Sequence, residues 1–211
     1  MIELYTWSTP NGRKISIALE EMELDYRVHP IDIGAGQQSG SDFIARFPNA
    51  KIPAIVDSET GVSLFESGAI LIYFAERAGR FLPPAGSERW AVLQWLMWQM
   101  GGFGPMLGQA AHFLHYQPGK SDYAAERYGN EARRLYAVLD GTLERNEFVA
   151  GDYSIADMAI WPWATRFDQQ GVDLAVFPNV RRWFETIAGR PAVQRGFAVP
   201  DATAEPPALA A

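Results

Sequence analysis

The sequence predicts an α/β domain followed by an all-α domain, because the spacing of its apolar residues changes along the chain. Up to about residue 80, short alternating segments typical of strands are mixed with helical spacing, and beyond residue 87 only helical spacing remains. A segment with two prolines, residues 81–86, separates the two patterns and is typical of a linker. We therefore expect domains over residues 1–80 and 87–197.

The first half of the α/β domain predicts two strands joined by a helix. Residues 2–7 (IELYTW) form the first expected strand, and residues 26–33 form the second. Between them, apolar side chains recur at the helical spacing i, i+3, i+4, i+7: Ile15, Ala18, Leu19 and Met22. Because a helix connects them, the two strands are expected to be parallel.

The second half of this domain predicts a helix, a hairpin and a further helix. A glycine-rich loop leads to a short helix around residues 43–47, and strands over 54–57 and 62–65 flank the turn Ser-Glu-Thr-Gly. Ser67, a natural N-cap, then opens a helix through Ala78. The expected order is βαβαββα, which suits a mixed four-stranded sheet with helices on its faces.

The second domain is expected to be a helical bundle. Its helical patterns cover residues 88–116, 121–146, 154–170, 178–189 and 191–197. The sequence Ser154-Ile155-Ala156-Asp157 has the form of a capping box, with Asp in place of the usual Glu or Gln. The glycine-rich run of residues 101–105 predicts a kink in a long helix. Residues 198–211, rich in Ala and Pro, are expected to be a disordered tail.

Composition and charge restrict the class of function. The formal net charge of the 211 residues is -7, whereas proteins that bind nucleic acid usually carry a basic face. No stretch approaches the roughly 20 apolar residues that span a bilayer, and the N-terminus lacks the pattern of a signal peptide. We therefore expect a cytoplasmic protein that binds neither nucleic acid nor membrane.

The sequence contains no cysteine, which excludes disulfides, thiolate metal ligands and a protein thiol as nucleophile. Any sulfur chemistry must use the thiol of a bound small molecule. His112 and His115 lie three residues apart, but no carboxylate is arranged with them as a third ligand, so no metal site is expected.

Two segments of the first domain have residues suited to a peptide-like ligand. Pro53 marks the first residue of a strand, and a cis Ile52–Pro53 bond would turn the backbone groups of Ile52 toward an extended peptide; a trans proline that starts the strand is the alternative. Glu66 and Ser67 stand at a helix start, where the α-carboxylate of a ligand could bind to the helix N-terminus. The carboxyl group of Glu66 could then accept hydrogen bonds from the α-ammonium of the same ligand. The alternative is a structural cap beside a solvated Glu.

A third segment, Thr9-Pro10-Asn11-Gly12, lies between the first strand and the first helix. A hydroxyl and an amide at this place would donate hydrogen bonds to a ligand thiolate and lower a pKa that starts near ~8.5. A turn with helix capping is the alternative interpretation.

Together these segments resemble the glutathione site of the glutathione transferase family in kind, order and spacing: Thr9-x-Asn11, Gln38, Lys51-Ile52-Pro53 and Glu66-Ser67. The stretches ELDYR, AKIPAIVD, LFESGAI, LQWLMWQMGGFGPMLGQ and YSIADMAIWPW look most like the bacterial nu-class branch, whose members are glutathione-dependent disulfide-bond oxidoreductases. The resemblance covers about residues 1–197. It implies a thioredoxin-like first domain, a helical second domain and a homodimer.

The resemblance also implies how glutathione is held. Ile52 would pair with the cysteinyl backbone, and Glu66 and Ser67 would take the γ-glutamyl end. Gln38 and Lys51 would lie near the glycine carboxylate. These assignments follow from the family pattern and not from the composition of the chain.

Three further residues have roles that the resemblance implies, and a fourth, Tyr5, is a candidate by its position. Thr9 and Asn11 would face the sulfur of glutathione. Arg127, in Glu-Arg-Tyr on a helix of the bundle, matches a residue that helps to hold glutathione in this branch, and an ordinary surface arginine is the alternative. Tyr5 is near the place where other classes keep a catalytic Tyr, but it falls inside the first strand, which favours a sheet role.

The implied activity is disulfide reduction, in which a glutathione thiolate attacks a disulfide sulfur and a second glutathione resolves the mixed disulfide. Conjugation to an electrophilic carbon and peroxide reduction by the same thiolate are the nearest alternatives. A non-catalytic module that binds apolar ligands or protein partners is the alternative of another class. Loss of the motif residues would favour that module, and all of them are present.

Overall fold

The computed structural model describes residues 1–209, which form two compact units. The N-terminal unit contains Met1–Leu82 together with Gly189–Ala208, and the helical unit contains Pro83–Ala188. The last helix therefore groups with the N-terminal unit, whereas the sequence placed residues 191–197 with the bundle. Residues 210 and 211 of the expected tail lie outside the described residues.

The N-terminal unit is built on a mixed four-stranded sheet, which confirms the predicted architecture. Its strands are β1 (Ile2–Thr6), β2 (Tyr26–Pro30), β3 (Ala54–Asp57) and β4 (Ser63–Phe65), in the spatial order β2-β1-β3-β4. Strand β1 is parallel to β2 and antiparallel to β3, and β3 is antiparallel to β4.

Strand β2 is shorter than the predicted span of residues 26–33 because the chain turns after Pro30. The carboxylate of Asp32 accepts hydrogen bonds from the backbone N–H groups of Gly34 and Ala35, which stabilises this turn. The turn leads to α2 (Ser41–Arg46), which begins two residues before and ends one residue before the helix predicted around residues 43–47.

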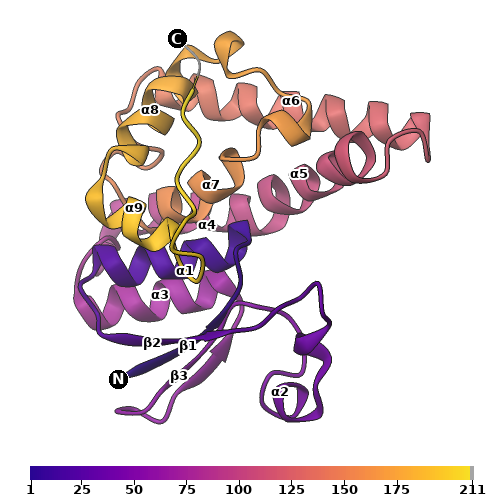
Figure 1. Ribbon diagram of the computed structural model, residues 1–211. Helices are drawn as coiled ribbons and strands as arrows, with labels where there is room; N and C mark the ends of the chain where they lie inside the picture. Colours follow the sequence, from indigo (N-terminus) through magenta and orange to yellow (C-terminus); the bar gives the residue numbers. More distant parts are fainter. Residues whose placement is uncertain (210–211) are drawn as a thin grey trace. The chain divides into compact units, whose positions relative to one another are not determined.

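Helices α1 (Pro10–Glu21) and α3 (Ser67–Ala78) cover one face of the sheet, as Figure 1 shows. Ile2 and Leu4 of β1 are buried beneath them, while Glu3 and Tyr5 point to the other face, as the period of two in a strand requires. Helix α2 lies on that other side (Figure 1). The N-terminal ends of α1 and α3 carry two of the segments in which the sequence predicts ligand-binding residues.

Helix α9 (Pro191–Phe197) packs along α1. The hydroxyl of Ser16 donates a hydrogen bond of 2.6 Å to the carbonyl oxygen of Gly196. A Cβ atom at Gly196 would lie 2.5 Å from the Cα atom of Ile17, so only glycine permits this close approach. Arg190 adds a two-pronged ion pair with Glu21, at 2.6 and 2.8 Å.

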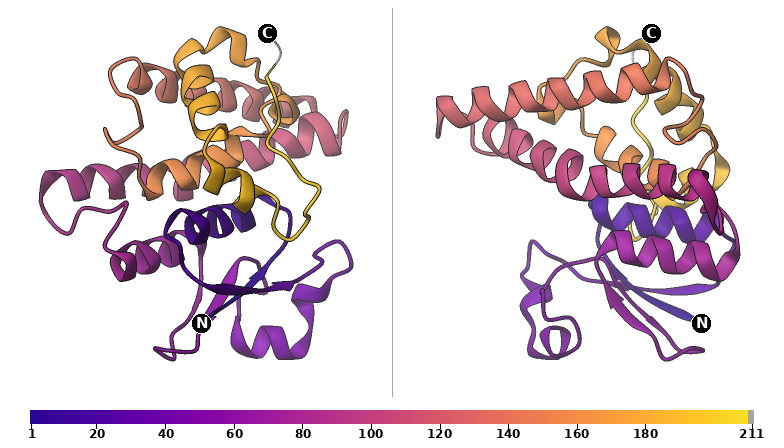
Figure 2. Two further views of the ribbon diagram at one scale, coloured as in Figure 1. Left: turned by 60° about the vertical axis from the view of Figure 1, so that its left-hand side comes forward. Right: turned by 180° about the vertical axis from the view of Figure 1, so that it is seen from behind.

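The helical unit contains α4 (Gly86–Trp98), α5 (Gly104–Ala111), α6 (Asp122–Leu143), α7 (Ile155–Ala164) and α8 (Pro178–Ala188). Helices α4 and α5 follow each other as one extended helical run, and α5 contacts α6 (Figure 2). A π-helical turn over Gln99–Phe103 joins α4 to α5 at the predicted glycine-rich run, and π turns are a known cause of helix bending.

The capping box at the start of α7 is confirmed. Asp157 is fully buried and accepts hydrogen bonds from the backbone N–H and the hydroxyl of Ser154, from the backbone of Val149 and from the indole of Trp183. Burial raises the pKa of Asp157 to about 6, although these donors oppose the rise. Within residues 1–209, no helix is long and apolar enough to cross a membrane.

Candidate functional site

A small cavity of about 70 Å³ opens in the N-terminal unit at the start of α3. It is lined by Asn11, Asn49, Lys51, Ile52, Pro53, Phe65, Glu66 and Ser67. The fold thus brings together predicted residues from three separate segments of the chain. Because pockets that enclose a whole small ligand measure roughly 300 Å³ or more, this cavity is suited to one end of a larger ligand.

Glu66 and Ser67 form the wall of this cavity at the helix start. Ser67 is the first residue of α3 and is 6% exposed, so it is not the N-cap that the sequence predicted; Glu66 occupies that position. Glu66 has a backbone φ of 73°, and a non-glycine residue in such a conformation costs on the order of 1–3 kcal/mol. Its carboxylate is exposed and accepts a hydrogen bond of 3.3 Å from the side-chain amide of Asn49.

Lys14 lies beneath this wall. Its side chain is 1% exposed, and its Nζ atom is 3.4 Å from the hydroxyl oxygen of Ser67. Burial lowers the pKa of Lys14 well below its usual range, and the negative charge of Glu66 opposes this effect. The start of α3 therefore combines a carboxylate, a hydroxyl and a buried amino group with the first N–H groups of a helix N-terminus.

Thr9 and Asn11 lie at the start of α1. Thr9 is the N-cap, and its hydroxyl oxygen accepts a hydrogen bond of 3.1 Å from the backbone N–H of Gly12. The structure thus gives Thr9 the capping role that the sequence left as an alternative, and a hydroxyl that accepts this bond still has a proton to donate. Asn11, two residues later, lines the cavity.

Lys51, Ile52 and Pro53 line the cavity from the segment that enters β3. The Ile52–Pro53 peptide bond is cis, which is one of the two states that the sequence left open. Pro53 is buried, Ile52 is partly exposed and Lys51 is exposed.

Gln38 and Arg127 do not line this cavity. Gln38 lies in the short 3-10 turn Gln37–Ser39, and its buried Oε1 atom has no hydrogen-bond partner. Arg127 is an exposed residue of α6 in the helical unit. There it lines a second cavity of about 380 Å³, together with Met106, Tyr128, Asn130, Glu131 and Arg134.

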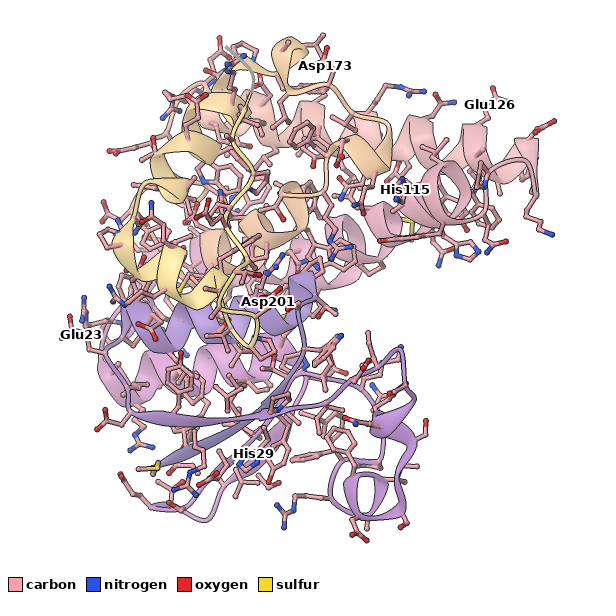
Figure 3. All side chains as sticks on the ribbon, in the orientation of Figure 1. Glu23, His29, His115, Glu126, Asp173 and Asp201 are labelled. Atoms are coloured by element: carbon pink, nitrogen blue, oxygen red, sulfur yellow. The ribbon has the colours of Figure 1, made fainter. Side chains whose placement is uncertain are left out.

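Tyr5 has the sheet role that its position in the strand suggested. Its ring stacks on that of His29 of β2, with centroids 4.7 Å apart, and its hydroxyl accepts a hydrogen bond of 3.0 Å from Arg46. Figure 3 labels His29 on this part of the sheet. Nowhere in the described part of the chain is a group of three or more His, Cys, Asp or Glu residues arranged to hold a metal ion.

The sequence analysis missed two residues that line the cavity, Asn49 and Phe65, and one that lies beneath its wall, Lys14. Asn49 stands only two residues before Lys51, so its place in the same loop was a usable signal. Lys14 follows Asn11 by three residues on a helix, a spacing that puts two side chains on one face. Phe65 adjoins Glu66, but as the last residue of a strand its local pattern predicts only a place in the hairpin.

Known proteins are similar to this chain in both fold and sequence. The glutathione S-transferase N-terminal domain matches residues 1–76, and the glutathione S-transferase C-terminal domain matches residues 103–191. The chain belongs to the glutathione S-transferase family. Among its relatives, disulfide-bond oxidoreductase YfcG of Escherichia coli (strain K12) is 52% identical over 198 residues, which cover 91% of this chain and 92% of the relative.

Solved structures agree with this assignment. A glutathione transferase family member from Pseudomonas fluorescens pf-5, crystallised with two glutathione bound, is 41% identical with a TM-score of 0.88, covering 94% of this chain and 93% of the other. A glutathione transferase from Pseudomonas putida, with one glutathione disulfide bound per subunit, is 42% identical with a TM-score of 0.88, covering 94% and 91%.

Proposed function

We propose that this protein binds glutathione and uses its thiolate to reduce disulfides by thiol–disulfide exchange. The observation that carries the proposal is the cavity at the start of α3. There a carboxylate and a hydroxyl stand side by side at a helix N-terminus, in a space sized for one end of a peptide. A free α-amino acid group, which has both an ammonium and a carboxylate, is the chemical complement of this arrangement.

The residues of the cavity fit the γ-glutamyl end of glutathione. The Glu66 carboxylate, held by Asn49, would accept hydrogen bonds from the α-ammonium. Ser67 and the first N–H groups of α3 would bind the α-carboxylate. Ile52 would pair with the cysteinyl backbone, and we keep Gln38, Lys51 and Arg127 as proposed contacts of glutathione on the strength of the family pattern.

Because the sequence has no cysteine, bound glutathione would supply the nucleophilic thiolate. The chain would supply hydrogen-bond donors near the sulfur, namely the amide of Asn11 and the hydroxyl of Thr9. Donors to a thiolate lower the pKa of the thiol, which increases the fraction of the reactive form. The overall reaction consumes two thiols for each disulfide reduced.

Disulfide reduction is preferred over conjugation for two reasons. YfcG, which is 52% identical, is named a disulfide-bond oxidoreductase. In addition, the leaving group in thiol–disulfide exchange is itself a stabilised thiolate. The reaction therefore needs little more from the protein than the Asn11 amide and the Thr9 hydroxyl, which stabilise the negative charge of the attacking thiolate. We also propose that the protein acts in the cytoplasm as a homodimer, as the family pattern implies.

The test is a comparison of turnover with glutathione and either bis(2-hydroxyethyl) disulfide or 1-chloro-2,4-dinitrobenzene. We expect disulfide reduction to be much faster than conjugation. Asn11→Ala should lower the reductase rate more than Thr9→Ala, because Thr9 already caps α1 and Asn11 lines the cavity. Efficient conjugation with negligible disulfide reduction would refute the reductase activity and leave the glutathione site intact.

A further inference from the structure

Lys14 is a buried, ionisable side chain next to the cavity that the reaction proposed above does not use. It stands on α1 one turn after Asn11, and only 1% of it is exposed. Its Nζ atom donates a hydrogen bond to the Ser67 hydroxyl at 3.4 Å, which links α1 to the first residue of α3 across 53 positions of the sequence.

Keeping a lysine at such a place is unfavourable unless something of opposite charge compensates for its burial. Lysine is among the residues least often fully buried, because the ammonium loses its hydration. Burial lowers the pKa of Lys14 well below its usual range, and Glu66 acts in the opposite direction. A ligand carboxylate at the start of α3 would add a second negative charge near Lys14, beside that of Glu66, and would further favour the protonated amino group.

We propose that Lys14 is a positioning residue that makes the start of α3 selective for the α-carboxylate of a γ-glutamyl group. The inference rests on the proposed function, since it assumes that Ser67 receives this carboxylate. Lys14 acts through Ser67: a hydroxyl that accepts one hydrogen bond becomes a better donor in the next. In its protonated form the amino group also adds positive potential to that of the helix N-terminus.

Glu66 and Lys14 then serve the two charged groups of the α-amino acid end separately. The exposed carboxylate of Glu66 is placed for the ammonium, and the buried amino group of Lys14 supports the hydroxyl that binds the carboxylate. This arrangement would favour a peptide with both groups over one that lacks the α-carboxylate. A lysine that only fills space between α1 and α3 would not discriminate between these two ligands.

The test measures binding of two ligands by isothermal titration calorimetry: glutathione, and 4-aminobutanoyl-Cys-Gly, which is glutathione without its α-carboxylate. Lys14→Met keeps the length of the side chain and removes the amino group. We expect it to weaken glutathione binding by about 10-fold or more, because the Ser67 hydroxyl would lose the group that supports its hydrogen bond to the charged carboxylate. Binding of the analogue should change by less than about 2-fold.

Arg13→Met is the matched control. Arg13 is the neighbouring cation of α1, 9% exposed, and its guanidinium lies 3.5 Å above the ring of Phe197. Removing it should affect the two ligands equally. Circular dichroism and thermal unfolding would establish that each variant is folded, and Lys14→Gln, which keeps a polar tip, replaces Lys14→Met if the latter does not fold.

An equal loss of affinity for both ligands in the Lys14 variant, or no loss for glutathione, would overturn the proposal while wild-type glutathione binding stands. The wild type also tests it without any substitution, because a preference for glutathione over the analogue of less than about 3-fold would mean that the carboxylate is not recognised. Failure of the wild type to bind glutathione at all would instead remove the proposed function and this inference together.

Discussion

Asp57, at the end of β3, is the centre of a charged cluster that should make stability depend on pH. Its carboxylate is fully buried and accepts hydrogen bonds from the hydroxyl of Tyr73 at 2.6 Å, from the backbone N–H of Glu59 at 3.0 Å and from the guanidinium of Arg77. Burial alone raises the pKa of Asp57, but these donors outweigh it and lower the pKa to about 2.

The size of the effect follows from the difference between the folded and unfolded chains. An unfolded Asp has a pKa near ~3.9, so a lowering by about 2 pH units corresponds to about 2.6 kcal/mol at pH 7. Because Arg77 is 26% exposed and water screens its charge, we expect about 2 kcal/mol. The folded pKa is the lower one, so this stabilisation is complete above about pH 5 and is lost progressively as the pH falls toward 1.

Asp57→Asn keeps the shape of the side chain and removes its charge. Urea unfolding followed by circular dichroism should show a free energy of unfolding lower by about 2 kcal/mol at pH 7, with the deficit falling to about half at pH 3. Glu59→Gln, which removes an exposed partner of the same Arg77, is the control and should cost less than about 1 kcal/mol. A deficit for Asp57→Asn that is the same at both pH values would refute the argument from charge.

Glu66→Ala should weaken glutathione binding by about 1–3 kcal/mol in isothermal titration, and wild-type affinity in this variant would remove Glu66 from the site. Ser154→Ala should lower the free energy of unfolding by about 1 kcal/mol through loss of the α7 cap, as measured by urea denaturation; an unchanged midpoint would contradict it. Light scattering should give twice the mass of one chain at micromolar concentration, and the mass of a single chain would argue against the dimer.

Local patterns in the sequence were enough to predict the elements that depend on nearby residues. The predicted helix from Ser67 to Ala78 has those bounds in the structure, and the capping box of Ser154 and Asp157 forms as expected. Strand alternation, helical spacing and helix caps depend on side chains a few positions apart in the chain. These elements can therefore be predicted from the sequence without knowledge of the fold. The motif segments likewise predicted most of the residues that line the cavity.

Tertiary structure alone decided which distant residues meet. Lys14 contacts Ser67 across 53 positions, and Arg190 pairs with Glu21 across 169. The backbone of Glu66, turned to a φ of 73°, takes the N-cap position that a local rule assigned to Ser67. Burial and charge pairing arise only when segments far apart in the chain pack together, because no local spacing specifies which side chain will lose its water and which partner will compensate for that loss.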